Sequence, residues 1–142
     1  MIKYLTNKTD LDFSQYNLVV DCTDNLKARL EIAKRSISAR VKLVTASVIQ
    51  EQGYISTLNP TLDKFACNHC FFEDWSGESR EINCSTEGVI STAVAMIASI
   101  QATECLKAMT NGENNTNTII HVNTWDLSTS KIAYSKNPAC QI

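Results

Sequence analysis

The chain has 142 residues, of which 44% are hydrophobic and 20% are charged, values typical of a single globular domain. Its net charge of −2 at pH 7 gives no basis for binding nucleic acid or an anionic membrane surface, so we expect neither as a partner. No apolar run reaches the roughly 18–20 residues that a membrane span needs, and the start lacks the charged head and apolar core of a signal peptide. We therefore expect a cytoplasmic protein.

The first part of the chain predicts a strand, a helix and a second strand. Residues 18–22 form a continuous apolar run, which is typical of a strand buried on both faces of a parallel sheet. Asp24 or Asn25 can cap a helix that runs through about Ala39, because apolar residues recur there at helical spacing. Residues 42–49 predict the next strand, which completes a βαβ unit with short connections.

The second part changes in character. Residues 53–58 alternate as in a half-exposed strand, and residues 61–86 are polar and irregular, which we interpret as a loop organised around a metal. One helix is predicted over residues 87–110; it is apolar nearly all round and should be buried. Its predicted main apolar stripe consists of Ile90, Val94, Ile97, Ile100, Leu106 and Met109. Residues 118–123 and 131–134 predict a hairpin.

The carboxylate of Asp24 follows the end of the first predicted strand. The carboxyl end of a parallel strand faces the crevice where such sheets bind ligands, and with ATP present a carboxylate there can hold Mg²⁺ through an oxygen. The alternative is that Asp24 only caps the following helix, a position that Asp strongly favours. Position alone favours the cap.

Six cysteines are many for this length, and without a signal peptide they favour metal binding or thiol catalysis over disulfides. The Cys67-x-x-Cys70 spacing lets two thiolates bind one zinc ion, which needs four ligands. Cys140, after Asn-Pro-Ala, suggests a second half of this zinc site. His69, His121 or water are candidates for the remaining ligand. The redox alternative needs such a pair at a helix N-terminus, whereas here two phenylalanines follow, so zinc is favoured.

Cys84 opens the long predicted helix. Unpaired backbone N–H groups and the helix dipole stabilise a thiolate at such a position, which suits a nucleophile or a sulfur carrier. The alternative is an incidental loop cysteine, and the sequence leaves both open. Cys22 and Cys105 are interpreted as small buried hydrophobic residues.

In their order and separation, these motifs resemble the MoeB, ThiF and HesA family, which adenylylates sulfur-carrier proteins and is related to the ubiquitin-activating enzymes. The resemblance runs from about residue 18 to residue 140. The motifs that carry it are Asp21-Cys22-Thr23-Asp24-Asn25 with Arg29, Gly53, Cys67-x-x-Cys70, Cys84-x-x-Glu87-Gly88-Val89, Ser99-Ile100-Gln101-Ala102 and Asn137-Pro138-x-Cys140. The resemblance implies the second half of a Rossmann-like α/β ubiquitin-activating-enzyme fold, with a short parallel sheet, an antiparallel extension, a zinc knuckle and a long buried helix.

The resemblance also implies an activity. Such enzymes use ATP to convert the C-terminal glycine of a ubiquitin-like sulfur-carrier protein into an acyl-adenylate, in molybdopterin or thiamine biosynthesis, and a sulfur donor or a cysteine then attacks the acyl group. By resemblance, Asp24 and Asn25 belong to the Mg·ATP site, and Cys84 is the catalytic cysteine of persulfide or thioester chemistry. The ligands of a structural zinc ion would be Cys67, Cys70 and Cys140.

The family's glycine-rich nucleotide loop has no counterpart in this sequence. We therefore expect residues 1–142 to be the carboxyl-terminal part of a ThiF-type domain without its nucleotide-binding half, inactive alone and binding Mg·ATP weakly or not at all. The strand at residues 18–22 would then be an apolar sheet edge, which predicts a homodimer or a partner chain that supplies the missing half. Two other hypotheses stay open: a non-enzymatic, zinc-stabilised module that binds the carrier, or sulfur transfer by Cys84.

Overall fold

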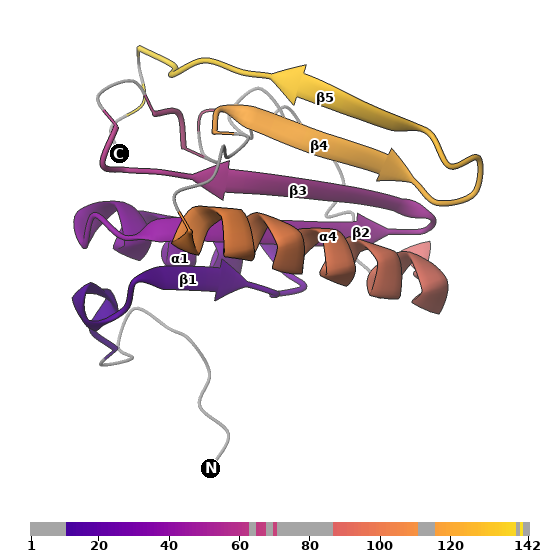
Figure 1. Cartoon of the computed structure of the whole chain (residues 1–142), viewed down its shortest axis with the longest axis horizontal. Coiled ribbons are helices and arrows are strands. Elements are labelled where there is room, and N and C mark those ends of the chain that lie inside the picture. The colour runs from indigo at the N-terminus through magenta and orange to yellow at the C-terminus, as the bar shows by residue number, and fades with distance from the viewer. Residues whose placement is uncertain are drawn as a thin grey trace.

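A computed structural model describes residues 11–62, 65–67, 70, 87–110, 116–138 and 140. The sheet has five strands, and helices pack against it (Figure 1). The elements are η1 (Phe13–Gln15), β1 (Leu18–Asp21), α1 (Leu26–Ser38), β2 (Lys42–Ile49), β3 (Gln52–Leu58), α4 (Ser91–Met109), β4 (Thr118–Asn123) and β5 (Thr129–Ala133). In these parts of the chain, no helix has the length and hydropathy to cross a membrane.

The sheet joins one parallel pair of strands to an antiparallel extension. β1 pairs parallel with β2, with Leu18 opposite Lys42 and Asp21 opposite Thr45, and α1 connects the two strands. The pairs β2–β3, β3–β4 and β4–β5 are all antiparallel. The predicted α/β class is therefore confirmed, and β1 and β5 form the two edges of the described sheet.

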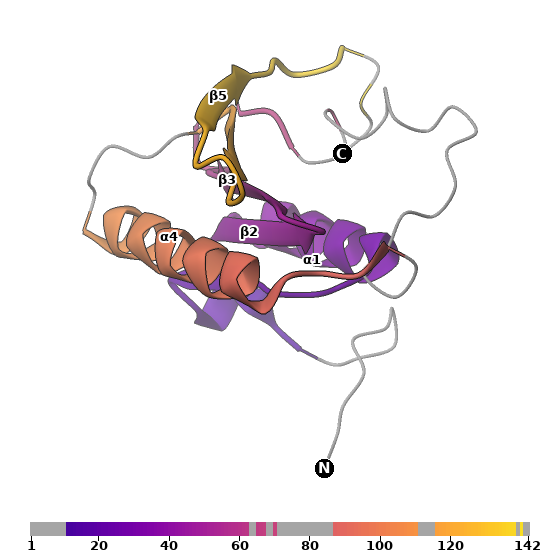
Figure 2. The same ribbon diagram turned by 90° about the vertical axis from the view of Figure 1, so that its right-hand side faces the viewer.

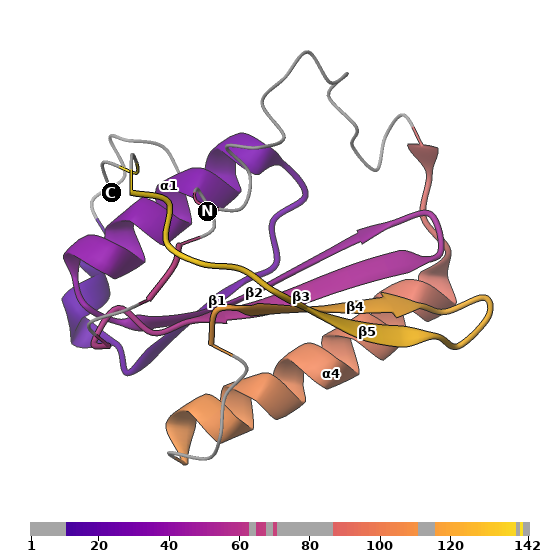
Figure 3. The same ribbon diagram turned by 90° about the horizontal axis from the view of Figure 1, so that it is seen from above.

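The two helices lie on opposite faces of the sheet, as Figures 2 and 3 show. The side chains of β2 alternate between the two resulting cores, since successive residues of a strand point to opposite faces. Leu43 packs on the α1 side with Ile32, whereas Val44 packs on the α4 side with Ile97. Burial on both faces explains why residues 42–49 are so continuously apolar.

The helix α4 differs from the prediction in its start and in its burial. It begins at Ser91 rather than at residue 87, because Gly88 has a φ of 77° and Val89 forms a bridge with Gln50. The sheet side of α4 buries Ala93, Ile97, Gln101, Glu104 and Ala108. Four residues of the predicted apolar stripe are instead exposed, namely Ile90, Val94, Leu106 and Met109. The prediction of a helix buried all round is therefore wrong.

Gly53 lets α4 approach β3 closely. A Cβ at this position would overlap the side chain of Ile97, which is itself buried in the core on this face. A glycine inside a strand often marks such a close approach. The motif glycine thus has a packing role in this fold.

Candidate functional site: an acidic turn and a cysteine cluster

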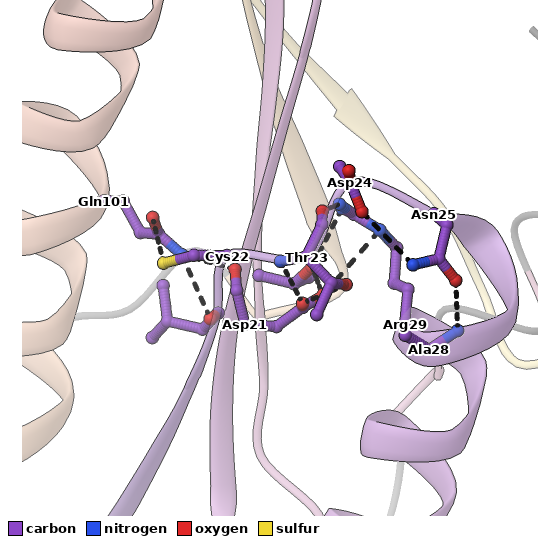
Figure 4. A network of polar contacts seen from close by, with 10 residues as sticks. Asp21, Cys22, Thr23, Asp24, Asn25, Ala28, Arg29 and Gln101 are labelled. Carbon is purple, nitrogen blue, oxygen red and sulfur yellow. Dashed lines mark hydrogen bonds and ion pairs between the residues drawn. The ribbon is translucent and has the colours of Figure 1, made fainter. Parts of the chain in front are cut away.

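The turn after β1 is built on a buried carboxylate (Figure 4). Asp21 is 0% exposed. Its Oδ1 accepts hydrogen bonds from the backbone N–H and the hydroxyl of Thr23, at 2.9 and 2.6 Å, and its Oδ2 accepts one from the hydroxyl of Thr45 at 2.6 Å. Nε of Arg29 lies 3.7 Å from the same Oδ2. The buried negative charge is therefore both hydrogen-bonded and paired, as a stable buried charge must be.

Arg29 ties this turn to α1 and β2. Its guanidinium donates to the hydroxyl of Thr45 at 3.1 Å and to the backbone oxygen of Thr23 at 2.7 Å. The side chain is also buried, so it supports the turn from inside. Asp21 and Arg29 are consequently structural residues of the turn and not solvent-facing ligands.

α4 reaches the same turn from the other face of the sheet through Gln101. Its Nε2 donates to the backbone oxygens of Asp21 and Val44, at 2.9 and 3.3 Å, and its Oε1 accepts from the thiol of Cys22 at 3.6 Å. Cys22 is exposed, so its predicted burial is wrong. Cys105 is half-buried and packs against the core on the α4 side.

Asn25, and not Asp24, caps α1. Oδ1 of Asn25 accepts from the backbone N–H of Ala28 at 2.8 Å, which satisfies one of the unpaired donors of the first turn. Asp24 is exposed, and its Oδ1 accepts from Nδ2 of Asn25 at 3.2 Å. The alternative that Asp24 is the helix cap is therefore wrong. Its carboxylate lies instead at the carboxyl end of the parallel pair β1–β2, above the buried network in Figure 4.

Cys67, Cys70 and Cys140 come together from distant parts of the chain. Sγ of Cys67 lies 3.5 Å from Sγ of Cys70 and 3.5 Å from Sγ of Cys140, and the three sulfurs all lie within 4.8 Å of one another. Sulfurs that bind one zinc ion tetrahedrally at about 2.3 Å are about 3.8 Å apart. The donor set therefore fits zinc as three of its four ligands.

The two halves of the cluster share one kind of backbone hydrogen bond. The backbone N–H of Cys70 donates to the oxygen of Cys67, and that of Cys140 donates to the oxygen of Asn137, each at 3.0 Å. The two hydrogen bonds thus span the same number of residues, and Asn137 stands where the first half has Cys67. This match supports the predicted second half of the metal site.

His121 is not part of the cluster, so its candidacy as the remaining ligand is wrong. Its ring stacks on Tyr54 with centroids 4.8 Å apart, and its Nε2 lies 3.1 Å from Oε1 of Gln52. His69 and Cys84 lie outside the described residues. Their predicted roles stay predictions.

The cysteine cluster is built into the core beneath α1. Cys67 and Cys70 pack with Leu43 and Leu58, and Cys140 lies against them. Burial raises the pKa of the Cys67 thiol to about 12. Burial acts in the same direction on Cys70, but hydrogen bonds with the backbone of Asn137 and Cys67 and with the thiols of Cys67 and Cys140 together outweigh it and lower the pKa of that thiol. A divalent cation would compensate the charge of the thiolates in this buried setting.

Asn117 and Tyr134 hold the first cysteine turn against the sheet. Oδ1 of Asn117 accepts from the backbone N–H of Ala66 at 2.7 Å. The hydroxyl of Tyr134 donates to the oxygen of Ala66 at 3.4 Å and lies 3.2 Å from Oγ of Ser56. Burial raises the pKa of Tyr134, which keeps this hydroxyl protonated. Sequence reasoning missed both residues, because their contacts follow no local spacing.

The fold does not bring the two clusters together. Asp24 and Asn25 precede the N-terminus of α1, whereas Ile37 and Ala39, at the opposite end of that helix, pack against the core cluster that contains Cys67 and Cys70. The molecule therefore carries an exposed acidic turn and a separate buried sulfur cluster.

Known proteins are similar to this chain in sequence. Residues 3–142 match the ThiF family. The chain belongs to this family. Among curated relatives, the sulfur carrier protein ThiS adenylyltransferase of Escherichia coli (strain K12) is 32% identical over 93 residues, which make up 66% of this chain and 36% of that protein. The adenylyltransferase and sulfurtransferase UBA4 of Meyerozyma guilliermondii is 27% identical over 113 residues, or 79% of this chain and 26% of that protein. The chain thus spans only about a third or a quarter of these ThiF-family relatives.

Solved structures show the same fold. E. coli MccB with ATP superposes with a TM-score of 0.66 at 12% identity, over 88% of this chain and 38% of MccB. A heterocyclase in complex with substrate and cofactor superposes with a TM-score of 0.68 at 16% identity, over 88% of this chain and 20% of that chain. These matches confirm a ThiF-like α/β fold, of which this chain provides a part.

Proposed function

We propose that this chain is part of an ATP-dependent adenylyltransferase that activates the C-terminal glycine of a ubiquitin-like sulfur-carrier protein. The observation that carries the proposal is the exposed carboxylate of Asp24 at the carboxyl end of the parallel pair β1–β2. Ligands bind at this edge of such sheets, and Asn25 performs the capping that would otherwise explain an acid here. Membership of the ThiF family and the activities of the relatives support the same proposal.

In this proposal Asp24 supplies an oxygen ligand to the Mg²⁺ of Mg·ATP, and Asn25 lies beside it. When bound, the metal supplies electrostatic stabilisation of the phosphates. The part of this chain is to hold the carboxylate in place: the buried pair of Asp21 and Arg29 fixes the turn from below, and the cap on α1 fixes it from the side.

The nucleotide site needs further groups. The four glycines of the sequence are widely separated, so none of them forms a glycine-rich loop whose backbone N–H groups could bind phosphates. We propose that this chain alone binds Mg·ATP weakly or not at all, and that the amino-terminal half of such a domain completes the site. The edge of β1 is where that half would join, since Val20 there is 46% exposed and backbone groups of an edge strand favour pairing.

The cysteine cluster has a structural role in this proposal. A zinc ion held by Cys67, Cys70 and Cys140 would join two segments that are 73 residues apart. Structural zinc sites contribute directly to folding free energy. Metal would therefore stabilise this domain without entering the adenylation site, which lies at the other end of α1.

The decisive experiment is ATP–pyrophosphate exchange with a sulfur-carrier protein. We expect no exchange by the chain alone, and exchange after the separately expressed amino-terminal half of a ThiF-family enzyme is added. Asp24→Asn should abolish that exchange with little change in thermal stability, whereas Asp126→Asn, which alters another exposed carboxylate, should leave it intact. Exchange that survives Asp24→Asn would contradict the assigned role.

The same experiment separates the other hypotheses. Carrier binding without exchange in any mixture would indicate a non-enzymatic binding module. A persulfide or thioester that disappears in Cys84→Ser would indicate sulfur transfer by that cysteine. Asp24→Asn would leave both of these outcomes unchanged.

A further inference from the structure

Two cysteines outside the metal cluster lie on the α4 side of the sheet. Cys22 follows β1 directly and is exposed, and its thiol donates to Oε1 of Gln101 on α4 at 3.6 Å (Figure 4). Cys105 lies on the same helix, four residues after Gln101. It is half-buried and packs against the core on this side. Neither thiol belongs to the cysteine cluster, so the pair is a separate group of nucleophilic side chains.

The geometry of α4 brings these two thiols near each other. Residues four apart lie on one side of a helix, with Cβ atoms about 5–6 Å apart, and helical side chains lean toward the helix N-terminus. The thiol of Cys105 therefore leans toward Gln101, the residue that contacts Cys22. Electrostatics agrees with this placement. Burial raises the pKa of the Cys105 thiol, and the charges of Cys22 and Glu104 raise it further, which requires a short separation.

We propose that Cys22 and Cys105 are a redox-sensitive thiol pair, which a hydroperoxide converts into a disulfide between α4 and the turn after β1. The exposed sulfur of Cys22 attacks the O–O bond of hydrogen peroxide, which gives a sulfenic acid and one water. The sulfur of Cys105 then displaces the sulfenic oxygen, which leaves as a second water, and the S–S bond forms. The two thiols lose two electrons and two protons in all, and one peroxide is reduced to two waters.

The turn provides the movement that the disulfide needs. A disulfide requires Cβ atoms about 3.5–4.5 Å apart, so Cys22 has to move toward α4. Cys22 comes after the last paired residue of β1, where the chain leaves the sheet. Oxidation also removes the thiol hydrogen that Oε1 of Gln101 accepts. Because Nε2 of Gln101 donates to the backbone oxygens of Asp21 and Val44, the disulfide disturbs the contact between α4 and the turn.

The disulfide would act on the turn that carries Asp24. Asp24 lies two residues after Cys22. The backbone oxygen of Thr23, between them, accepts from Arg29 at 2.7 Å on the α1 side. A pull toward α4 therefore opposes this support and displaces the carboxylate. This consequence rests on the proposed function: oxidation should lower pyrophosphate exchange in the mixture with the amino-terminal half by about tenfold or more, and a thiol reductant should restore it.

Peptide mapping after treatment with hydrogen peroxide tests the disulfide. A protease that cuts after glutamate cleaves behind Glu87 and Glu104 and so separates Cys84 from Cys105. Mass spectrometry without reductant should then detect one linked pair of peptides, which contain Cys22 and Cys105. Reduction should release the two peptides. Non-reducing electrophoresis checks that the link lies within one chain.

Serine variants provide the matched controls for this map. Cys22→Ser and Cys105→Ser should each abolish the linked pair, whereas Cys84→Ser should retain it. Thermal melting checks that all three variants are folded. The inference is overturned if Cys22 and Cys105 stay unlinked in the folded, peroxide-treated chain, or if Cys22 is linked to another cysteine instead.

The exchange assay tests the effect on the turn with Cys105→Ser as its control. This variant keeps Cys22 and Asp24 but cannot form the disulfide, so its exchange should withstand peroxide. Equal losses of exchange in the variant and the unsubstituted chain would overturn the effect on the turn. If no mixture shows exchange, the proposed adenylation activity fails, whereas the peptide map still decides whether the thiol pair exists.

Discussion

The two polar clusters on the α1 side of the sheet are built in opposite ways. The exposed part of the acidic turn is held by neighbours in sequence: the bonds between Asp21 and Thr23 and between Asn25 and Ala28 span two and three residues. The cysteine cluster joins Cys67 to Cys140, 73 residues further along. The turn presents an exposed group on a buried support, whereas the cluster is buried in the core. Function and stability should therefore be separable at the turn and inseparable at the cluster.

The largest expected effect comes from removing a cysteine of the cluster. Cys67→Ser should lower the zinc content from one ion per chain to well below one, and should lower the unfolding free energy by several kcal/mol because metal binding and folding are coupled. A chelator should destabilise the unsubstituted chain in the same way. Metal analysis and thermal melting measure both effects.

The control for this prediction is Cys105→Ser, a half-buried thiol of α4 outside the cluster. This variant should keep its zinc. A measured content of well under one zinc ion per chain, in unsubstituted protein purified without chelator, would contradict the metal site. The cysteine cluster would then not combine metal binding with stability.

The next largest effect is a difference in stability between substitutions of the buried Asp21 and the exposed Asp24. Asp21→Ala should cost about 3–5 kcal/mol of unfolding free energy, because it leaves the buried guanidinium of Arg29 without its counter-ion. Asp24→Ala, at an exposed position, should change stability by about 0.5 kcal/mol or less. Denaturant unfolding of the two variants measures the difference. Equal losses of unfolding free energy in the two variants would show that Asp24 supports the turn as much as Asp21 does.

A smaller effect tests how the cysteine cluster depends on remote contacts. Asn117→Ala should cost about 1–3 kcal/mol, because the N–H of Ala66 loses its acceptor. Asn117 also has a φ of 59°, which favours Asn or Gly over Ala. Asn117→Gly keeps this conformation and loses only the hydrogen bond, so it should be the milder change. Both variants should bind zinc more weakly, as metal competition measures; unchanged affinity would show that the cluster forms without this contact.

Patterns that are local in sequence predicted the fold well. The continuous apolar runs gave β1 and β2 nearly to the residue, and alternation with turn residues gave the hairpin of β4 and β5. The three cysteines that the sequence assigned to a metal site lie together in the structure, and the Cys67-x-x-Cys70 spacing predicted the first two of them. In each case the signal lies within a few neighbouring residues.

Features that depend on tertiary contacts were missed. Periodicity could not show that one side of α4 is exposed, since an apolar sequence looks the same whether or not a partner covers it. It also placed the helix start too early, because the bridge between Gln50 and Val89 is a long-range contact. The burial of Asp21 depends on Thr45 and Arg29, and no spacing rule links these three residues.

The smallest expected effect decides which residue of the acidic turn is structural. Asn25→Ala should cost about 1 kcal/mol, because the N–H of Ala28 loses its capping acceptor. Asn25→Asp should retain most of the stability, since Asp and Asn are nearly equal as caps. Circular dichroism during thermal unfolding measures the loss.

If Asp24→Ala lowers the unfolding free energy as much as Asn25→Ala does, Asp24 shares the capping role. Its exposed position would then no longer support metal binding. If only Asn25→Ala is destabilising, the two adjacent residues of the turn have different roles. The amide then stabilises the helix, and the neighbouring carboxylate is left for a ligand at the edge of the sheet. That division is the opposite of the cysteine cluster, where the same side chains would both bind the metal and hold the fold together.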